Sequence, residues 1–200
     1  MVPAAVMTLP TQAVPGETLP APPIAQSVDA SLIADCLQGR MNAFDEIVRL
    51  HTPRVFNYVL HMTRHRQDAE DITQQAFIKA YTHLASFDPT RSFIAWLLTI
   101  ARRTALNHFR SAKNFEPVAE ETATQEPTPD RQFEKRDQLD TLWAQARRVL
   151  SEREFEILWL RYAEDMSLED TARIAGITQT HTKIIAFRAR QRLMKLQSQS

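Results

Sequence analysis

The C-terminal end of the chain carries a block of cationic side chains with no acidic residue among them. No aspartate or glutamate follows Asp170. Guanidinium and ammonium groups pair with phosphate oxygens, and arginine does so through two parallel hydrogen bonds. The formal net charge of the whole chain is zero, so the distribution of charge matters more than its sum. This end of the chain is therefore expected to face phosphates, through Arg173, Lys183, Arg188, Arg190, Arg192 and Lys195.

Two sequence signals predict where helices begin shortly before this cationic block. Ser151 is followed by Glu154, and Ser167 is followed by Asp170. In this spacing a serine oxygen accepts a hydrogen bond from a free backbone N–H group of the first helical turn. Each serine is therefore expected to begin a helix.

A glycine then separates the second of these helices from a third. Gly176 suits a left-handed turn, and Thr178 can cap the helix that follows. This pattern is typical of a helix-turn-helix, in which the second helix enters the major groove of DNA. A capped helical hairpin with a solvated basic face is the alternative. In the helix from Thr178 to about Arg190, the spacing places Thr182, Ala186, Ala189 and Leu193 inward and Gln179, Thr180, His181, Lys183, Ile184, Phe187 and Arg188 outward.

The rest of the chain has helical rather than alternating periodicity. Apolar or small residues recur at helical spacing, for example at Ile72, Ala76 and Ala80, and the chain contains only three glycines. No Asn-Gly or Asp-Gly hairpin signal is present. The predicted fold is all-α, with helices near residues 29–38, 42–63, 67–84, 92–113, 133–149, 152–163, 168–175 and 179–196.

Two proline-rich segments divide the sequence into two small helical domains. Residues 1–26 are too poor in large apolar side chains to form a core, and we expect a disordered tail there. Residues 115–134 combine prolines with acidic residues and are expected to form a flexible linker. The predicted domains are therefore residues 27–114 and 135–200.

Several classes of protein and site are disfavoured by the sequence. No apolar run approaches the roughly 20 residues of a membrane span, and prolines interrupt the apolar N-terminal segment, which disfavours a secretory signal. Cys36 is the only cysteine, so a reducing cytoplasm is the expected compartment. His61 and His65 could share a helix face, but they lack a third metal ligand at a recognisable spacing. We expect no cofactor, no metal and, without a phosphate loop or nucleophile motif, no catalysis.

Both predicted domains resemble those of one family of transcription factors. The stretches DAEDITQQAFIKAY and SFIAWLLTIARRTALNHFR resemble region two of the extracytoplasmic-function (ECF) sigma factors of the sigma-70 family. Their region four is similar to the stretch LSEREFEILWLRYAEDMSLEDTARIAGITQTHTKIIAFRARQRLMKL. The resemblance implies a non-enzymatic subunit that binds core RNA polymerase at the β′ clamp helices and the β flap, and directs it to promoter DNA. It also implies an anti-sigma factor that holds the chain inactive.

The resemblance places one contact with polymerase on the helix of DAEDITQQAFIKAY. In the family this helix docks on the β′ clamp helices, and the matching residues here are Asp71, Gln74 and Gln75. From periodicity alone, these three residues form the solvated face of an amphipathic helix. The family commonly has Gln-Glu where this chain has Gln74 and Gln75.

The second region-two motif combines an apolar face with a basic one. Trp96, Leu97 and Ile100 are expected to face inward, whereas arginine on the other face can pair with phosphates and asparagine with an adenine edge. By resemblance, this helix and the loop before it bind the -10 element as single-stranded DNA, with one base flipped into a pocket. Family members often carry Asn where this chain has Arg103 and Asp where it has Asn107. The predicted -10 contacts are Phe87, Arg91, Ser92, Arg102, Arg103, Asn107 and Arg110.

The resemblance assigns recognition of the -35 element to the second helix of the helix-turn-helix. Lys183, Ile184 and Phe187 match positions that contact bases. Arg188 and Arg190 fit anchoring to the DNA backbone. The usual Thr-Val-Lys-Ser-Arg run of the family is replaced by one with branched apolar residues, which predicts an atypical -35 element or weaker binding there. The predicted set is Thr178, Gln179, Thr180, His181, Lys183, Ile184, Phe187, Arg188 and Arg190.

Two other functions compete with this interpretation. A conventional helix-turn-helix regulator would bind duplex DNA through its second domain, while its first domain senses a ligand or another protein. A hydrolase or metalloenzyme would use the pair of His61 and His65. Binding to core polymerase separates the first alternative from a sigma factor, and analysis of the purified protein for metal separates the second.

Overall fold

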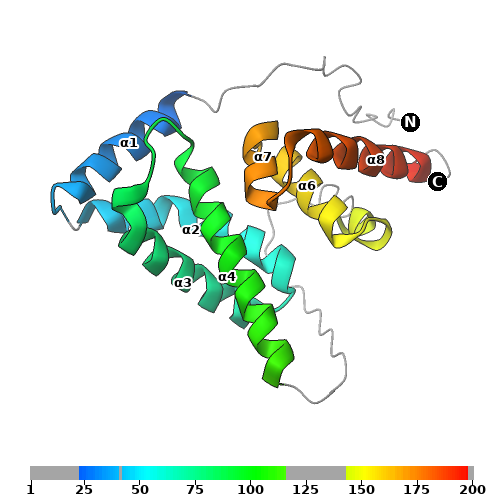
Figure 1. The fold of residues 1–200 in the computed structure, drawn as a ribbon, viewed down its shortest axis with the longest axis horizontal. Coiled ribbons are helices and arrows are strands. Elements are labelled where there is room, and N and C mark those ends of the chain that lie inside the picture. The colour runs from blue at the N-terminus through cyan, green and yellow to red at the C-terminus, as the bar shows by residue number, and fades with distance from the viewer. Residues whose placement is uncertain (1–22, 41, 116–142, 198–200) are drawn as a thin grey trace, which may run out of the picture.

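The computed structural model describes residues 23–40, 42–115 and 143–197 of the chain. These residues form helices and no strand, which confirms the predicted all-α class. The first domain contains α1 (Pro23–Leu37), α2 (Asn42–Thr63), α3 (Arg66–His83), the short 3-10 helix η1 (Leu84–Ser86) and α4 (Phe93–Phe115) (Figure 1). In the second domain residues 143–149 are helical and are followed by α6 (Glu152–Tyr162), α7 (Leu168–Ala175) and α8 (Gln179–Gln197).

The first domain is built around an apolar core between α2, α3 and α4, with α1 packed against α2. The predicted stripe of Ile72, Ala76 and Ala80 is fully buried on α3, and so is Leu97 on α4. Small alanine side chains let the helices approach closely, while the branched side chains between them fill the remaining space. This packing fixes which face of α4 is left for other contacts.

The second domain begins its helices where the two serine signals predicted them. Ser151 and Glu154 form a complete capping box at the start of α6. Ser167 accepts a hydrogen bond from the backbone N–H of Asp170 at the start of α7. Gly176 ends α7 with a φ of 67°, in the left-handed region that glycine adopts at low cost. The predicted helix-turn-helix geometry is therefore present.

The observed boundaries differ from the prediction at a few places. Helix α1 begins at Pro23 rather than near residue 29, so residues 23–26 of the predicted tail are helical. Proline is tolerated in a first helical turn because its missing N–H group would have no partner there. Phe115, predicted to open the linker, is the last residue of α4. Residues 1–22 of the tail, and the linker beyond Phe115 together with the predicted start of the 133–149 helix, lie outside the described residues.

We searched the described part of the chain for membrane spans. None of its helices combines the length and the apolar composition that crossing a bilayer requires.

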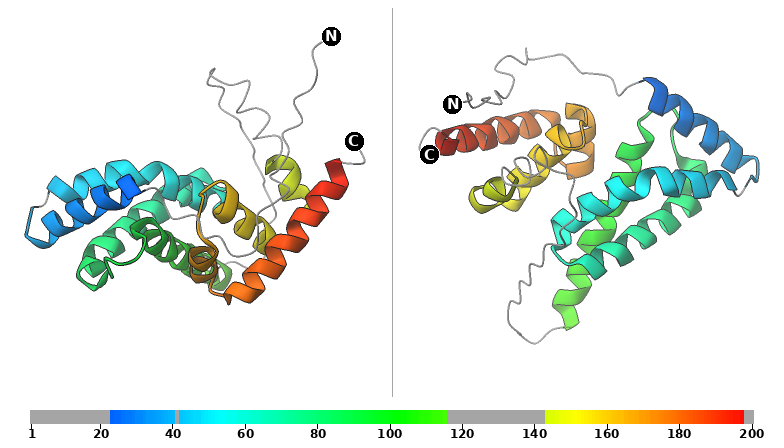
Figure 2. Two further views of the ribbon diagram at one scale, coloured as in Figure 1. Left: turned by 90° about the horizontal axis from the view of Figure 1, so that it is seen from above. Right: turned by 180° about the vertical axis from the view of Figure 1, so that it is seen from behind.

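The two domains share part of one apolar core. Leu160 of α6, Met166 of the loop before α7, and Ile174 of α7 are buried in the same cluster as side chains of the first domain such as Leu98. Helix α7 packs against α4, whereas α8 packs on α6 and α7 and runs away from the first domain (Figures 1 and 2). The surface of α8 is therefore open while the surface of α4 is partly covered.

Replacement of Gly176 by alanine tests the turn between α7 and α8. We expect Gly176→Ala to lower the free energy of unfolding by about 1–2 kcal/mol, because an L-residue is disfavoured in the left-handed region. An added Cβ has room, since its nearest neighbour would be the Arg102 Nη1 atom at 4.0 Å. Gly176→Asn is the matched control and should lose less, because asparagine tolerates this conformation. Equal losses in denaturant titrations of the two variants would contradict the assignment.

Candidate functional site

Helix α8 exposes the side chains that its periodicity placed outward. Thr182, Ala189 and Leu193 are buried, and Ala186 is half-buried. Ile184 is 43% exposed and Phe187 is 62% exposed, beside cationic and polar neighbours. Apolar side chains in a major groove can contact thymine methyl groups, while cations contact phosphates. The residues that remain exposed are Thr178, Gln179, Thr180, His181, Lys183, Ile184, Phe187 and Arg188, and Arg190 is half-buried.

Helix α8 is held by caps and an ion pair within its own domain. The Thr178 hydroxyl accepts a hydrogen bond from the His181 backbone N–H at 3.2 Å. Further along the helix, Arg192 Nη1 lies 2.8 Å from a carboxylate oxygen of Glu154. The same Glu154 completes the capping box of α6, so the start of α6 and the middle of α8 are tied together. These contacts fix the position of α8 within the second domain and leave its exposed face accessible.

Four of the residues predicted to contact the -10 element lie in the open. Arg91 is exposed in the loop before α4, where it pairs with Asp88 at 3.0 Å. Arg103, Asn107 and Arg110 are exposed on α4, and Arg110 donates a hydrogen bond to Asn107 Oδ1 at 3.4 Å. These side chains form a polar, cationic strip along one side of the helix.

Two further members of the predicted -10 set are engaged by the first domain. The ring of Phe87 packs against those of Phe93 and Trp96, with a centroid distance of 5.3 Å in each case. Ser92 accepts a hydrogen bond from the Ala95 backbone N–H at 3.4 Å, at the start of α4. Phe87 and Ser92 therefore shape the loop and the helix start that carry the exposed arginines.

Arg102 does not lie on the open basic face predicted from the sequence. Its Nε donates to one carboxylate oxygen of Glu156 at 2.6 Å and its Nη2 to the other at 3.3 Å. The Tyr58 hydroxyl donates to the same carboxylate at 2.7 Å. Only 13% of the side chain of Arg102, and the same share of Glu156, is exposed. The partner is Glu156 of α6, so this residue of the predicted DNA-binding face is occupied by the second domain.

The pKa values of this buried cluster follow from its contacts. Burial raises the pKa of Tyr58 well above its ordinary value, and the charge of Glu156 raises it further. Burial alone would lower the pKa of Arg102, but its hydrogen bonds to Glu156 and the negative charge of that carboxylate raise it overall. Tyr58 therefore stays protonated and Arg102 stays charged, which preserves the three hydrogen bonds to Glu156.

Two other polar contacts join the domains. Arg54 of α2 donates to the Glu164 carboxylate at 2.9 Å and to its carbonyl oxygen at 2.7 Å. Arg147 donates to the His61 carbonyl oxygen at 3.0 Å and lies 2.8 Å from its Nδ1. Arginine has only donors, so His61 Nδ1 must accept, and the ring is neutral. Burial and the charge of Arg147 lower the pKa of His61 to about 3.

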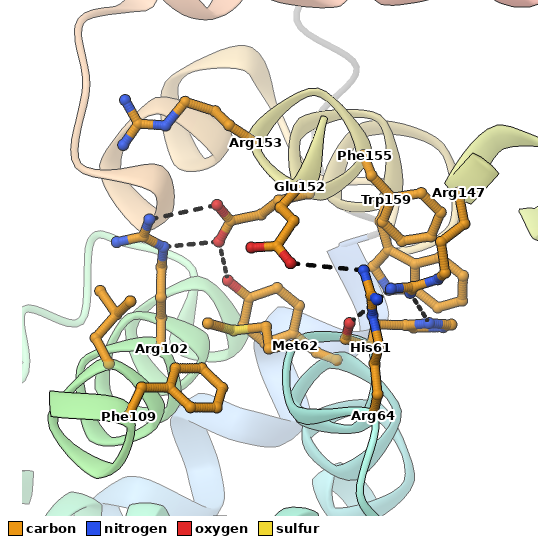
Figure 3. Close-up of a pocket in the computed structure, with 13 residues that line it drawn as sticks. His61, Met62, Arg64, Arg102, Phe109, Arg147, Glu152, Arg153, Phe155 and Trp159 are labelled. Atoms are coloured by element: carbon orange, nitrogen blue, oxygen red, sulfur yellow. Dashed lines mark hydrogen bonds and ion pairs between the residues drawn. The ribbon is translucent and has the colours of Figure 1, made fainter. Parts of the chain in front are cut away.

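A cavity of about 250 Å³ lies between the domains, beside these contacts. Arg102 enters it from α4, while His61 and Arg147 lie next to each other at its opposite side (Figure 3). Phe155 and Trp159 cover the ring of His61 from the second domain. The cavity thus lies at the interface between the two domains, where charged side chains meet apolar and aromatic ones.

The predicted polymerase-binding face lies on α3. Asp71, Gln74 and Gln75 are exposed, as predicted. Gln74 also lines an open groove between α2 and α3, together with Ile78, which is 66% exposed. The sequence analysis missed Ile78, although its position off the buried stripe of α3 is visible from periodicity. Other side chains of the groove are Phe44, Val48, Thr52, Phe56, Glu70, Thr73 and Phe77.

The histidine pair does not form the shared face considered from the sequence. His61 lies on α2, which ends at Thr63, and its ring contacts Arg147. His65 caps the start of α3 and accepts a hydrogen bond from the Asp68 backbone N–H. Among the described residues, no group of three or more potential ligands is arranged to hold a metal ion.

Comparison with protein families finds two matching domains in the chain. Residues 47–115 match the model of Sigma-70 region 2, and residues 148–195 match that of Sigma-70, region 4. The first match lies within the first helical domain, without α1 and the start of α2, and the second lies within the second domain; together they span more than half of the chain.

Curated relatives match over nearly the whole chain. The ECF RNA polymerase sigma factor SigM of Mycobacterium tuberculosis strain H37Rv is 32% identical over 174 residues, covering 84% of each chain. The RNA polymerase sigma-H factor of Pseudomonas aeruginosa is 28% identical over 184 residues, covering 86% of this chain and 95% of the relative.

Solved structures share the fold. The sigma factor RpoE from Bartonella quintana, in complex with the anti-sigma factor NepR, aligns with a TM-score of 0.62 and 26% identity. That alignment covers 78% of this chain and 96% of the other. CnrH, in complex with the cytosolic domain of CnrY, aligns with a TM-score of 0.61 and 21% identity. It covers 86% of this chain and 99% of the other, so the two-domain helical fold is shared.

The environment of His61 predicts how its ring titrates. Because its pKa is lowered to about 3, the His61 ring should stay neutral from pH 8 to pH 5 in the intact chain. Nitrogen-15 spectra of the histidine rings across this range are the measurement, with His61→Gln used to assign its signals. A His61 signal that shifts with a midpoint near pH 6.5 would show that Arg147 and Trp159 do not cover the ring.

Proposed function

Because the chain belongs to the extracytoplasmic-function sigma factors of the sigma-70 family, we propose that three of its surfaces share the work of initiation. The exposed face of α3 binds core RNA polymerase, the cationic side of α4 contacts the -10 element, and α8 contacts the -35 element. The chain is a non-enzymatic initiation factor, so these surfaces act by binding alone. The exposed apolar and cationic face of α8, on a capped helix-turn-helix, is the observation that carries the proposal.

Helix α8 supplies duplex recognition. Its first turns project Lys183, Ile184 and Phe187 away from the second domain. In a helix-turn-helix these turns meet base edges, while cations nearby meet phosphates. Ile184 and Phe187 favour contacts with thymine methyl groups over hydrogen-bonded recognition of guanine. This composition supports an atypical -35 element.

Helix α4 and the loop before it supply contacts with the -10 element. Arg91, Arg103 and Arg110 are exposed and can pair with phosphates of a single strand. Asn107 lies among them, and its side-chain amide can form hydrogen bonds with an exposed base edge. The aromatic cluster around Phe87 supports the loop at the point where a flipped base would be received.

The groove between α2 and α3 extends the polymerase-binding face. Asp71, Gln74 and Gln75 supply polar contacts, and the exposed side chain of Ile78 supplies an apolar one beside them. An apolar anchor surrounded by polar groups is the usual composition of a protein interface. We assign this surface to the β′ clamp helices, as the family resemblance implies.

An anti-sigma factor is the second protein partner that we propose. The RpoE structure that this chain resembles contains the anti-sigma factor NepR. A regulator of this kind would cover surfaces that polymerase uses, and it would work in the cytoplasm, where transcription takes place.

The second domain is expected to make a further contact with polymerase, at the β flap.

A pull-down with core RNA polymerase tests the function and separates it from that of a conventional regulator. Ile78→Asp places a charge in the proposed interface and should weaken binding at least about tenfold, because charge burial without a partner is costly. Leu50→Asp is the matched control: Leu50 is also an exposed apolar residue, 39% exposed on α2, but does not line the groove. The proposal fails if the wild-type chain does not bind core and instead binds a duplex operator tightly by itself.

Replacement of Phe187 tests the assignment of α8. We expect Phe187→Ala to reduce discrimination between -35 sequences by about 1–3 kcal/mol per affected base pair, the usual size of a lost base contact. Transcription from templates that carry single substitutions in the -35 element is the measurement. Gln191→Ala, at another exposed position of α8, is the control. Identical template preferences for the two variants would remove Phe187 from the contact surface.

A further inference from the structure

The cavity between the two domains contains a guanidinium group that has no carboxylate of its own. Arg147 is half-buried at one side of the cavity, and its two hydrogen bonds go to neutral atoms of His61, the carbonyl oxygen and Nδ1. Both carboxylates that line the cavity are paired with other arginines, Arg64 and Arg102. We propose that this cavity binds a small aromatic carboxylate, whose oxygen atoms are held by Arg147 and Arg64.

The electrostatic surroundings of Arg147 favour an anion beside it. Burial lowers the pKa of its guanidinium group, and the positive charge of Arg64 lowers it further. Both effects make the charged form less stable here than in water, although an arginine stays charged at neutral pH. The charge of Glu152 acts in the opposite direction, but its side chain is 91% exposed and is screened by water. An anion bound next to Arg147 would therefore offset an unfavourable interaction.

The backbone at Arg64 is an independent reason to expect a role for its side chain. Arg64 directly follows the last residue of α2 and has a φ of 56°, in the left-handed region. Glycine and asparagine adopt this region at a lower cost than arginine does. A backbone outlier of this kind is a reason to look for a function of the residue. Here the side chain lines the cavity, so the arginine contributes a cation to it at some cost in stability.

The walls of the cavity determine the rest of the ligand. Met62, Leu106 and Phe109 line it from the first domain, while Phe155 and Trp159 line it from the second. Flat aromatic rings pack well against side chains of these types. The volume of about 250 Å³ is slightly below the roughly 300–1,000 Å³ of pockets for drug-sized ligands. A body of one or two fused rings therefore fits better than a larger molecule.

The cationic and apolar parts of the cavity are adjacent. The guanidinium group of Arg147 lies over the ring of Phe155, at 4.0 Å from its centroid. Figure 3 shows Arg64 beside Arg147, on the same side of the cavity as Trp159. A simple inorganic anion would leave the apolar walls in contact with water, and a neutral ring would leave Arg147 without a counter-charge. A molecule that carries a carboxylate directly on a ring satisfies both parts.

A carboxylate suits the charge of the cavity better than a phosphate monoester does. Glu152 lies 3.5 Å from Arg64, so a ligand held by the two arginines also approaches this negative charge. A carboxylate carries one negative charge, whereas a phosphate carries between one and a half and two at about pH 7. Repulsion from Glu152 is therefore smaller for the carboxylate.

This site goes beyond the proposed function, because neither polymerase nor DNA takes part in it. Arg102 is the one residue of the predicted promoter contacts that lines the cavity, and it is already bound to Glu156. No role in ligand binding is assigned to it. The site can therefore be tested on the free, full-length chain.

Titration of the full-length chain with 2-naphthoate tests the site. This probe combines one carboxylate with two fused rings, and should bind with a dissociation constant of about 1 mM or tighter, the usual range for a ligand of its size. Shifts of the arginine Nε–H signals in NMR spectra are the measurement, and the signals of Arg147 and Arg64 should move. The neutral 2-naphthylmethanol and the ring-free acetate should each bind at least about fivefold more weakly, because each lacks one kind of contact.

Two variants remove the cationic groups separately. Arg147→Gln should weaken the binding of 2-naphthoate at least about fivefold, as expected for a lost charge-assisted hydrogen bond. Arg64→Asn should weaken it as well, but without lowering the free energy of unfolding, because asparagine tolerates the left-handed backbone. Arg148→Gln is the matched control, since Arg148 is an exposed neighbour on the same helix that does not line the cavity. Its affinity should equal that of the wild-type chain.

Three results would overturn the proposal. The first is the absence of any binding of 2-naphthoate at roughly ten times the expected dissociation constant. The second is equal affinity for 2-naphthoate and 2-naphthylmethanol, which would remove the need for the arginines. The third is wild-type affinity in Arg147→Gln or Arg64→Asn, or an equal loss in Arg148→Gln. Each of these results leaves promoter selection untouched, because that function is measured by transcription.

Discussion

The arrangement of the two domains is constrained by one buried carboxylate, that of Glu156. It accepts two hydrogen bonds from Arg102 and one from Tyr58, in surroundings that leave little of either charged side chain exposed. A charge removed from water in this way is tolerated only when its hydrogen-bonding capacity is filled. The loss of Glu156 would take this partner from both Arg102 and Tyr58, so the contact strongly constrains how the two domains pack.

Helix α4 carries both Arg102, which makes this contact, and the exposed residues predicted to bind DNA. One of its faces is fixed in the first domain's core through Leu97 and Leu98, and a second face holds Arg103, Asn107 and Arg110 in solvent. Separating about eleven stacked base-pair steps costs on the order of 15 kcal/mol at roughly 1.4 kcal/mol per step. Capture of a single base returns only about 1–3 kcal/mol. A sigma factor therefore supplies sequence preference and nucleating contacts, while the polymerase supplies most of the binding energy.

The local structure was largely predictable from the sequence, whereas contacts between distant residues were not. The capping serines, Gly176 and the buried stripe of α3 are determined by neighbours within a few residues, and each was found as predicted. Glu156 meets Arg102 from a separate domain, and no local pattern marks such a partner. Arg102 was consequently placed on an open face. The roles assigned to individual residues on α3, α4 and α8 stay predictions, because exposure alone does not identify what a side chain binds.

The central claim is that this chain, and not polymerase alone, selects the start site through two promoter elements. Run-off transcription with core polymerase and a library of randomised promoters tests it most directly. The account predicts that adding the chain enriches templates with two conserved motifs at a fixed spacing, one for each domain. Transcripts that are unchanged by the chain, or enrichment of one motif regardless of the distance to any other, would contradict it.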